Sequence, residues 1–309
     1  MRRSRRAAQP DVTAPDATAR LRAVQRRLRL PARLRVRGRL SGEHRSVHKG
    51  RSLELDDLRH YEPGDDVRDV DWKASARTGA VLMRRHVAER KQELLVVVDT
   101  GIEMRARAAG GGAKADLAVL ATGFLGQVAV QAGDLVGLLA GDRAGRVRAP
   151  MRHHRAHLEL LLRQLERRVA TSGAPADVIG LLDEARRVTR RRSLVVVVTD
   201  EGPFTDAHAE SVRRLRLRHD VLWLTIRDAE LTDDALAGAD LVDITGSSRL
   251  PALLREDREL AASYVASTTA AAEHRRAALR RLGVPADEVG ADVDVVPALV
   301  RLLDRAGRA

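Results

Sequence analysis

The chain has 309 residues, which permits one large domain or two modest ones, and 44% of them are apolar, enough for a hydrophobic core. It contains no cysteine, which excludes disulfides and any thiolate-bound metal. The formal net charge of +12 permits contact with nucleic acid or an anionic membrane, whereas an aromatic content of 2% argues against a surface that stacks single-stranded bases.

Residues 1–30 are expected to form a basic, partly disordered segment. Residues 1–18 are polar and rich in Arg, Pro and Ala, which is typical of a disordered chain. Ala19–Leu30 predicts a short basic helix, which we expect to be solvated, and its arginines are the best candidates for contact with nucleic acid. No apolar stretch follows the opening arginines and no run approaches the length of a membrane-spanning helix, so we expect a cytoplasmic protein.

Residues 31–90 predict a β-rich region. Leu34–Leu40 alternates apolar residues with arginine, as a strand with one exposed face does. Val67–Trp72 also alternates, which would place Asp69 and Asp71 on one face of a strand. The other features expected in this region are a turn at Pro63-Gly64, a helical turn over Lys73–Thr78 that stops at Gly79, and a strand over Ala80–Val87.

The stretch Leu53–Arg85 is the part of the chain most dense in interleaved acidic and basic side chains. Three interpretations stay open: a hydrogen-bonded network that pins two elements together, a docking surface for a partner protein, or a metal or catalytic carboxylate site. No nucleophile or histidine lies at a matching local spacing for acid–base chemistry. The residues assigned to the network or docking surface are Arg59, Tyr61, Gly64, Asp65, Asp66, Arg68, Asp71, Trp72 and Arg77.

Residues 91–250 alternate between strand and helix patterns. Glu93–Asp99 and Ser193–Asp200 are continuous apolar runs, which is typical of strands buried on both faces of a parallel sheet. The alternation implies right-handed crossovers and an α/β fold with a doubly wound, Rossmann-like sheet. The other elements expected here are helices over Ala115–Ala132, His153–Arg168, Ala176–Thr189 and Asp206–Arg218, the last capped by Asp206, and strands over Leu135–Ala140, Val147–Arg148, Val221–Ile226 and Leu241–Ile244.

Residues 251–309 are expected to form a C-terminal helical extension. Ala261–Leu282 is long and Ala-rich, Gly283-Val284-Pro285 interrupts it, and Pro297–Ala306 predicts a last short helix. No motif for chemistry lies in this extension. Earlier in the chain, Gly110–Lys114 lacks the Gly-Lys-Ser/Thr of a phosphate loop, and the histidines near residue 155 lack a third metal ligand.

A family resemblance rests on the segment Leu58–Arg85, which contains Y-E-P-G-D-D-V-R-D-V-D-W-K-A-S-A-R-T-G. This segment closely resembles the hallmark of the family named domain of unknown function 58. The strand that ends at Asp99 resembles the first strand of the von Willebrand factor A fold that such proteins contain, and Lys114 matches a position flanking its first helix. The resemblance implies a von Willebrand factor A-like, doubly wound, mostly parallel sheet flanked by helices, with a small N-terminal β-rich subdomain.

The resemblance also implies a Mg²⁺ site at the carboxyl ends of the strands, with the pattern D-x-S-x-S, then a Thr, then an Asp. Here the first motif reads Asp99-Thr100-Gly101-Ile102-Glu103, so both serine hydroxyls are missing, and Thr171 or Ala176 stands at the Thr position. The candidate ligands of a degenerate metal-ion-dependent adhesion site are Asp99, Glu103 and Asp200. In the alternative, Asp99 and Asp200 cap the segments that follow their strands, and no cofactor is expected.

Association with MoxR-type AAA ATPases is the functional implication of the resemblance. We expect a non-enzymatic interaction module that engages such an ATPase and helps present client proteins, through Leu53–Arg85 or the strand ends near Asp99. The alternative is a basic nucleic-acid-binding protein that uses the N-terminal arginines. A metal-dependent hydrolase around Asp99 and Asp200 is a third hypothesis, which lacks a visible base and a second metal cluster.

Overall fold

A computed structural model describes residues 22, 24, 26, 55–62, 66–86, 91–231, 242–245 and 257–307. The strand expected over Leu34–Leu40 and the turn at Pro63-Gly64 lie outside these residues, as does most of the segment 1–30. None of the described helices combines the length and the apolar character that a bilayer-spanning helix needs.

A six-stranded sheet forms the centre of the fold, in the order β5-β4-β3-β6-β7-β8. Every pairing is parallel except that of β4 with β5, which is antiparallel. Counted from β3 along the chain, this is the order 3-2-1-4-5-6 of a doubly wound fold, so the predicted fold class is confirmed. The strands are β3 Glu93–Asp99, β4 Leu135–Asp142, β5 Gly145–Arg152, β6 Leu194–Thr199, β7 Asp220–Ile226 and β8 Ala286–Val289.

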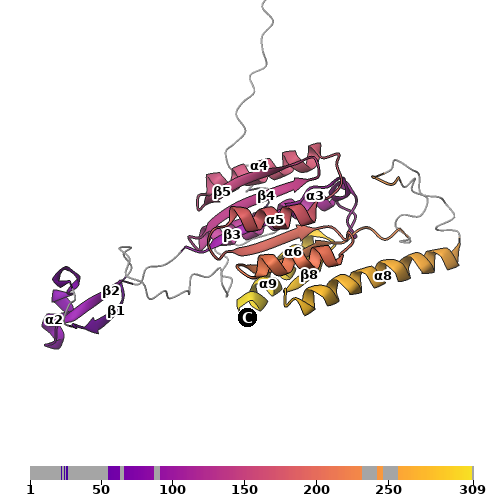
Figure 1. Cartoon of the computed structure of the whole chain (residues 1–309). Coiled ribbons are helices and arrows are strands. Elements are labelled where there is room, and N and C mark those ends of the chain that lie inside the picture. Colours follow the sequence, from indigo (N-terminus) through magenta and orange to yellow (C-terminus); the bar gives the residue numbers. More distant parts are fainter. Residues whose placement is uncertain are drawn as a thin grey trace, which may run out of the picture.

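Helices cover both faces of this sheet (Figure 1). Alternate side chains of β3 enter two separate cores, because successive residues of a strand point to opposite faces. On one face lie α3 Lys114–Gln131, α4 Arg155–Thr171 and α9 Asp292–Gly307. On the other lie α5 Val178–Val188, α6 Asp206–Arg216 and the end of α8 Arg258–Arg281.

The two apolar runs recognised in the sequence are the central strands β3 and β6, which pair with each other in parallel. All six residues of β6 are buried, and only Glu93 of β3 is partly exposed. Strands covered by helices on both faces have no reason to alternate apolar with polar residues, which is why their sequences are continuous.

The edges of the sheet differ from the prediction. The strand expected at Val147–Arg148 is the complete antiparallel strand β5, and β8 was not predicted at all. Val242 forms only an isolated bridge and is followed by a turn, so the strand predicted over Leu241–Ile244 is wrong within its described residues. The sequence of β8 lacks the apolar run that predicts a buried strand, because β8 is short, lies at an edge of the sheet, and carries Asp287 and Glu288.

Helix α6 begins at Asp206, and the residue that caps it is the one before. Thr205 is the N-cap, and its backbone N–H donates to Nδ1 of His208 at 3.2 Å. The prediction that Asp206 caps the helix was therefore wrong, since Asp206 is the first helical residue. An acidic residue in the first turn still interacts favourably with the positive end of the helix dipole.

The stretch Leu53–Arg85 contributes a separate two-stranded sheet of β1 Leu55–His60 and β2 Leu82–His86. Between them, Val67–Asp69 forms a 3-10 turn and α2 spans Trp72–Thr78, so the strand predicted over Val67–Trp72 was wrong. Gly79 ends α2 with a φ of 70°, as predicted. In Figure 1 this unit stands apart from the six-stranded sheet, and packing of one on the other is not seen among the described residues.

Part of the N-terminal segment packs on the main domain. Arg22, Val24 and Arg26 are helical, as the prediction for Ala19–Leu30 requires. Val24 is only 5% exposed and belongs to the same core as α3, where it lies against Gly123. The expectation that this helix is solvated is therefore wrong for its apolar face, because Val24 fills the space that the missing side chain of Gly123 leaves.

Candidate functional site

The carboxyl ends of β3 and β6 bring Asp99 and Asp200 to one edge of the sheet. The two strands are parallel neighbours, so the residues at their ends meet at the same rim, where ligand sites of open α/β sheets form. Asp99 is fully buried, and its Oδ1 accepts a hydrogen bond from the Gly101 N–H at 2.9 Å. Its Oδ2 is buried and has no hydrogen-bond partner in the part of the chain that the structure describes.

The environment of Asp99 favours the protonated carboxyl. Burial raises the pKa of Asp99 to about 7, against the opposing effect of the Gly101 hydrogen bond. The negative charges of Asp200, Glu103 and Asp142 add to the rise. All three predicted metal ligands therefore lie close enough to interact electrostatically.

In the loop after β3, the two serines of the expected metal motif correspond to Gly101, which has no side chain, and Glu103, which carries a carboxylate. A side chain on Gly101 would meet Oε2 of Glu103 and would lie 2.6 Å from the backbone nitrogen of Ala176. Oε2 of Glu103 accepts from that same Ala176 N–H at 3.3 Å. Glycine at 101 therefore leaves the space into which the Glu103 carboxylate folds, and Glu103 ties this loop to the segment before α5.

Asp142, at the end of β4, is a buried hub that the sequence analysis missed. Its Oδ2 accepts from Ser172 Oγ at 2.8 Å and from Thr100 Oγ1 at 3.3 Å, and it forms an ion pair with Arg168. The hydroxyl sought at Thr171 instead donates to its own helix, to the carbonyl of Arg167 at 2.8 Å. The only sequence signal for Asp142 was its place directly after a buried strand.

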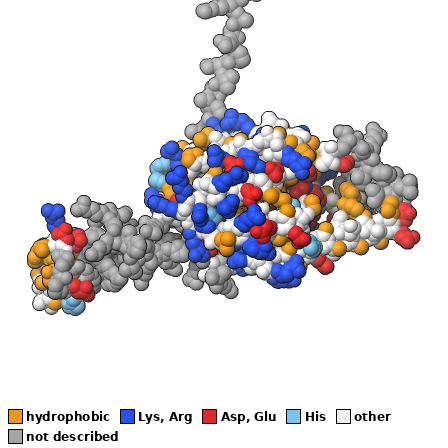
Figure 2. Space-filling view, in the orientation of Figure 1, with side chains coloured by type: hydrophobic (Ala, Val, Ile, Leu, Met, Phe, Trp, Pro, Cys, Tyr) orange, Lys and Arg blue, Asp and Glu red, His pale blue; other side chains and the backbone are white. Residues whose placement is uncertain are grey.

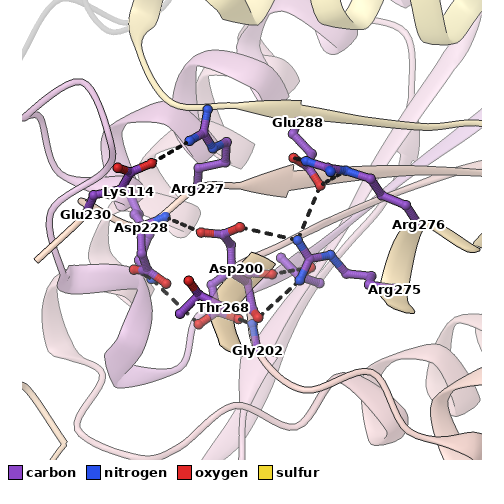
Figure 3. A network of polar contacts seen from close by, with 12 residues as sticks. Lys114, Asp200, Gly202, Arg227, Asp228, Glu230, Thr268, Arg275, Arg276 and Glu288 are labelled. Carbon is purple, nitrogen blue, oxygen red and sulfur yellow. Dashed lines mark hydrogen bonds and ion pairs between the residues drawn. The ribbon is translucent and has the colours of Figure 1, made fainter. Parts of the chain in front are cut away.

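Lys114 is the buried cation of the site (Figure 3). Its side chain is 1% exposed although it opens α3, and its Nζ forms an ion pair with Asp228 and lies 3.6 Å from Oδ2 of Asp200. Burial raises the pKa of Asp228, and Lys114 opposes that rise. A buried ammonium requires such partners, because an isolated charge in a protein interior is very costly.

A second buried cation, Arg275 of α8, continues the network (Figure 3). Its guanidinium is 3% exposed and lies 3.3 Å from carboxylate oxygens of both Glu201 and Glu288. Arg276 pairs with Glu288 from the exposed side. Glu201 also accepts from the Asp228 N–H at 2.9 Å, so the network joins the ends of β6, β7 and β8 to α8.

A cleft of about 280 Å³ opens beside these residues, between the segments that follow β3 and β6 and the start of α5. One wall is aromatic. The ring centroid of Phe204 lies 5.6 Å from that of Trp223, edge-on, and 5.6 Å from that of His208, stacked. Trp223 lines the cleft and is 2% exposed, and its buried Nε1 finds no hydrogen-bond partner among the described residues. Arg143 stands exposed at the rim and forms no ion pair with any described residue.

The side chains at this edge fit Mg²⁺ poorly. Asp200 Oδ1 accepts a hydrogen bond from the Gly202 N–H at 2.9 Å, and its Oδ2 faces Lys114. Glu103 Oε2 accepts a hydrogen bond from the Ala176 N–H. Asp99 Oδ2 has no hydrogen-bond partner among the described residues, but the other two carboxylates are partly engaged, whereas Mg²⁺ requires near-octahedral oxygen coordination. Among the residues that the structure describes, no group of three His, Asp or Glu side chains is arranged to hold a metal ion.

Of the residues predicted as a network or docking surface in the Leu53–Arg85 stretch, some cap helical turns and others are exposed to solvent. Asp66 accepts from the Arg68 N–H and Asp71 from the Ala74 N–H, both at 3.0 Å, so each starts a helical turn. Trp72 is 65% exposed and Tyr61 43% exposed. Gly64, Asp65 and the Arg59 side chain lie outside the described residues, and Arg68 and Arg77 are exposed.

Comparison with known proteins finds relatives of this chain in mycobacteria. It is 34% identical over 221 residues to Uncharacterized protein Rv1480 of Mycobacterium tuberculosis and Uncharacterized protein Mb1516 of Mycobacterium bovis, covering 69% of this chain and 68% of each relative. Two solved structures share parts of the fold at low identity. An aerotolerance-related membrane protein of Bacteroides fragilis matches with a TM-score of 0.47 and 12% identity, over 69% of this chain and 99% of that one.

The second is the manganese-loaded TRAP protein of Plasmodium vivax, with a TM-score of 0.30 and 13% identity, over 45% of this chain and 58% of that one. The family model described as protein of unknown function DUF58 matches residues 57–277, from β1 into α8. The chain therefore belongs to the DUF58 family.

Proposed function

We propose that this protein is a cytoplasmic, non-enzymatic interaction module that binds a partner protein in the cleft at the carboxyl edge of the sheet. The observation that carries the proposal is the cleft itself, with its aromatic wall and, at its rim, the exposed Arg143, which has no ion pair among the described residues. Arg143 is exposed at the rim, where a carboxylate of a bound protein could pair with its guanidinium.

The polar groups around the cleft serve the fold rather than a reaction. Thr205 and His208 resemble a nucleophile and its base, with Oγ1 and Nδ1 2.8 Å apart. They are, however, the cap of α6, and burial lowers the pKa of His208. Two of the carboxylates at the edge are similarly engaged, Asp200 with Lys114 and Glu103 with a backbone N–H.

The partner that we propose is a MoxR-type AAA ATPase, with which this protein would present client proteins. Two surfaces compete for the contact: the cleft, and the exposed aromatic residues Tyr61 and Trp72 of the small unit. The cleft is favoured because it is concave, has an aromatic wall and carries the exposed cation Arg143 at its rim, whereas exposed aromatic side chains on a surface are common and carry less information.

Co-purification of the tagged full-length chain from its native host tests this proposal. The variants are Arg143→Glu at the cleft and Trp72→Asp on the small unit, with Arg191→Glu, exposed before β6 at the opposite end of the sheet, as the matched charge reversal. We expect the ATPase to be recovered with wild type, Trp72→Asp and Arg191→Glu, and lost with Arg143→Glu. Loss with Trp72→Asp alone would move the contact to the small unit, and recovery of no ATPase with any protein would contradict the proposal.

Nucleic-acid binding is the second candidate, favoured by the net charge of +12. Figure 2 shows many Lys and Arg side chains on the visible face, interspersed with acidic ones. Several exposed arginines of the chain are paired, as Arg192 is with Asp220 and Arg214 with Glu210, which weakens the positive field. A gel shift whose affinity falls steeply with salt would support this candidate, because released counterions make phosphate binding salt-dependent.

A further inference from the structure

The position of Lys114 has a consequence for metal binding at the carboxylate edge. Its side chain is 1% exposed, and its ammonium forms an ion pair with Asp228. The same ammonium lies 3.6 Å from Oδ2 of Asp200, the residue predicted as the last metal ligand (Figure 3). A side-chain cation therefore already neutralises the carboxylate that a divalent ion would need.

The other positions of the expected metal motif also offer little to a metal ion. Gly101 offers no hydroxyl, and adding a side chain there would collide with Glu103 and with the backbone of Ala176. Glu103 is held by the Ala176 N–H at 3.3 Å. A divalent ion placed between Asp99 and Asp200 would thus find few free oxygens and a like charge beside it.

We propose that the Lys114 ammonium takes the place of a divalent cation at this edge. Lys114 supplies the positive charge that holds Asp200 and Asp228 together, and the protein is complete without Mg²⁺ or Mn²⁺. The inference concerns the electrostatics of the chain itself and does not depend on which partner the cleft binds.

The test follows thermal unfolding of the purified full-length protein in EDTA and in millimolar Mg²⁺ or Mn²⁺, with calorimetric titration of Mn²⁺ into the wild type. We expect no saturable heat and no change in the wild-type midpoint. In Lys114→Ala, we expect the midpoint in EDTA to fall by roughly 10 °C, because breaking a buried ion pair leaves carboxylates unpaired. Either metal should restore part of that loss, because the space of the ammonium is then free and Asp200 and Asp228 have lost the cation that neutralised them.

Two further variants keep the test decisive. Lys114→Met retains the length of the side chain without its charge, so it should fold, melt below the wild type in EDTA and gain stability with Mn²⁺. Lys114→Arg keeps the charge and should remain insensitive to metal. Saturable Mn²⁺ binding by the wild type, or a Lys114→Met midpoint equal to that of the wild type in EDTA, would overturn the proposal.

Discussion

Gly101 and Glu103 share one space: the carboxylate of Glu103 lies where a side chain on residue 101 would stand. The hydrogen bond from Ala176 N–H holds that carboxylate in place, so the loop after β3 and the segment before α5 close on each other. The absence of a side chain at 101 is thus a structural requirement of this loop.

Gly101→Ala is therefore expected to lower the free energy of unfolding by about 1–3 kcal/mol, the usual cost of overpacking a tight site. The new Cβ would lie 2.6 Å from Ala176 N, and a backbone atom cannot move aside as a flexible side chain does. Urea denaturation measures the effect. Gly112→Ala is the matched control, because nothing lies within 4 Å of a Cβ built there. Equal stability of the two variants would contradict the shared space.

The pH dependence of stability reports on Asp99. Because burial raises its pKa in the folded protein to about 7, the folded state keeps a proton that the unfolded state has lost. Stability should therefore fall as pH rises from about 4, the unfolded value, to about 7, and stay lower above it. A shift of this size corresponds to a loss on the order of 4 kcal/mol.

Asp99→Asn removes that titration and keeps an acceptor for the Gly101 N–H. We expect this variant to be less pH-dependent than the wild type and to exceed its stability above pH ~7. Denaturant unfolding in EDTA across this range makes the comparison. Parallel stability curves for the two proteins would show that Asp99 does not titrate as described.

Arg275 and Arg276 are adjacent in sequence but differ in burial, which makes them a matched pair. Arg275 is 3% exposed between Glu201 and Glu288, and removing it takes away the ion-pair partner of Glu201 and one of the two partners of Glu288. Arg275→Ala should cost about 3–5 kcal/mol of unfolding free energy. Arg276 is 53% exposed, so Arg276→Ala should cost less than about 1 kcal/mol. Comparable losses in chemical denaturation would argue against the network as the anchor of α8.

Packing of the N-terminal segment on the main domain is tested by Val24→Ala. Val24 is 5% exposed against α3, so removing its two methyl groups should cost about 1–3 kcal/mol. Arg26→Ala, at an exposed position two residues on, should leave the melting midpoint unchanged. A Val24→Ala midpoint indistinguishable from that of the wild type would mean that this segment adds nothing to the stability of the domain.

Local sequence was sufficient for the centre of the fold. The runs Glu93–Asp99 and Ser193–Asp200 predict strands because burial on both faces demands apolar side chains at every position. Parallel pairing of those strands then brings Asp99 and Asp200 to one rim, as expected. In the small unit, Gly79 was predicted correctly because a left-handed helix end has a local signature, whereas the cap Asp71 was misread as part of a strand.

By itself, then, the sequence of this protein determined its family, the class of its sheet and the rim where its charged residues gather. Only the tertiary structure decided what those residues do: that Lys114 reaches Asp200 and Asp228, that Asp142 gathers Thr100 and Ser172, and that β8 completes the sheet. The physical reason is that periodicity and turn chemistry act between near neighbours in the chain. Contacts between distant residues follow from strand order and register, which no local pattern contains.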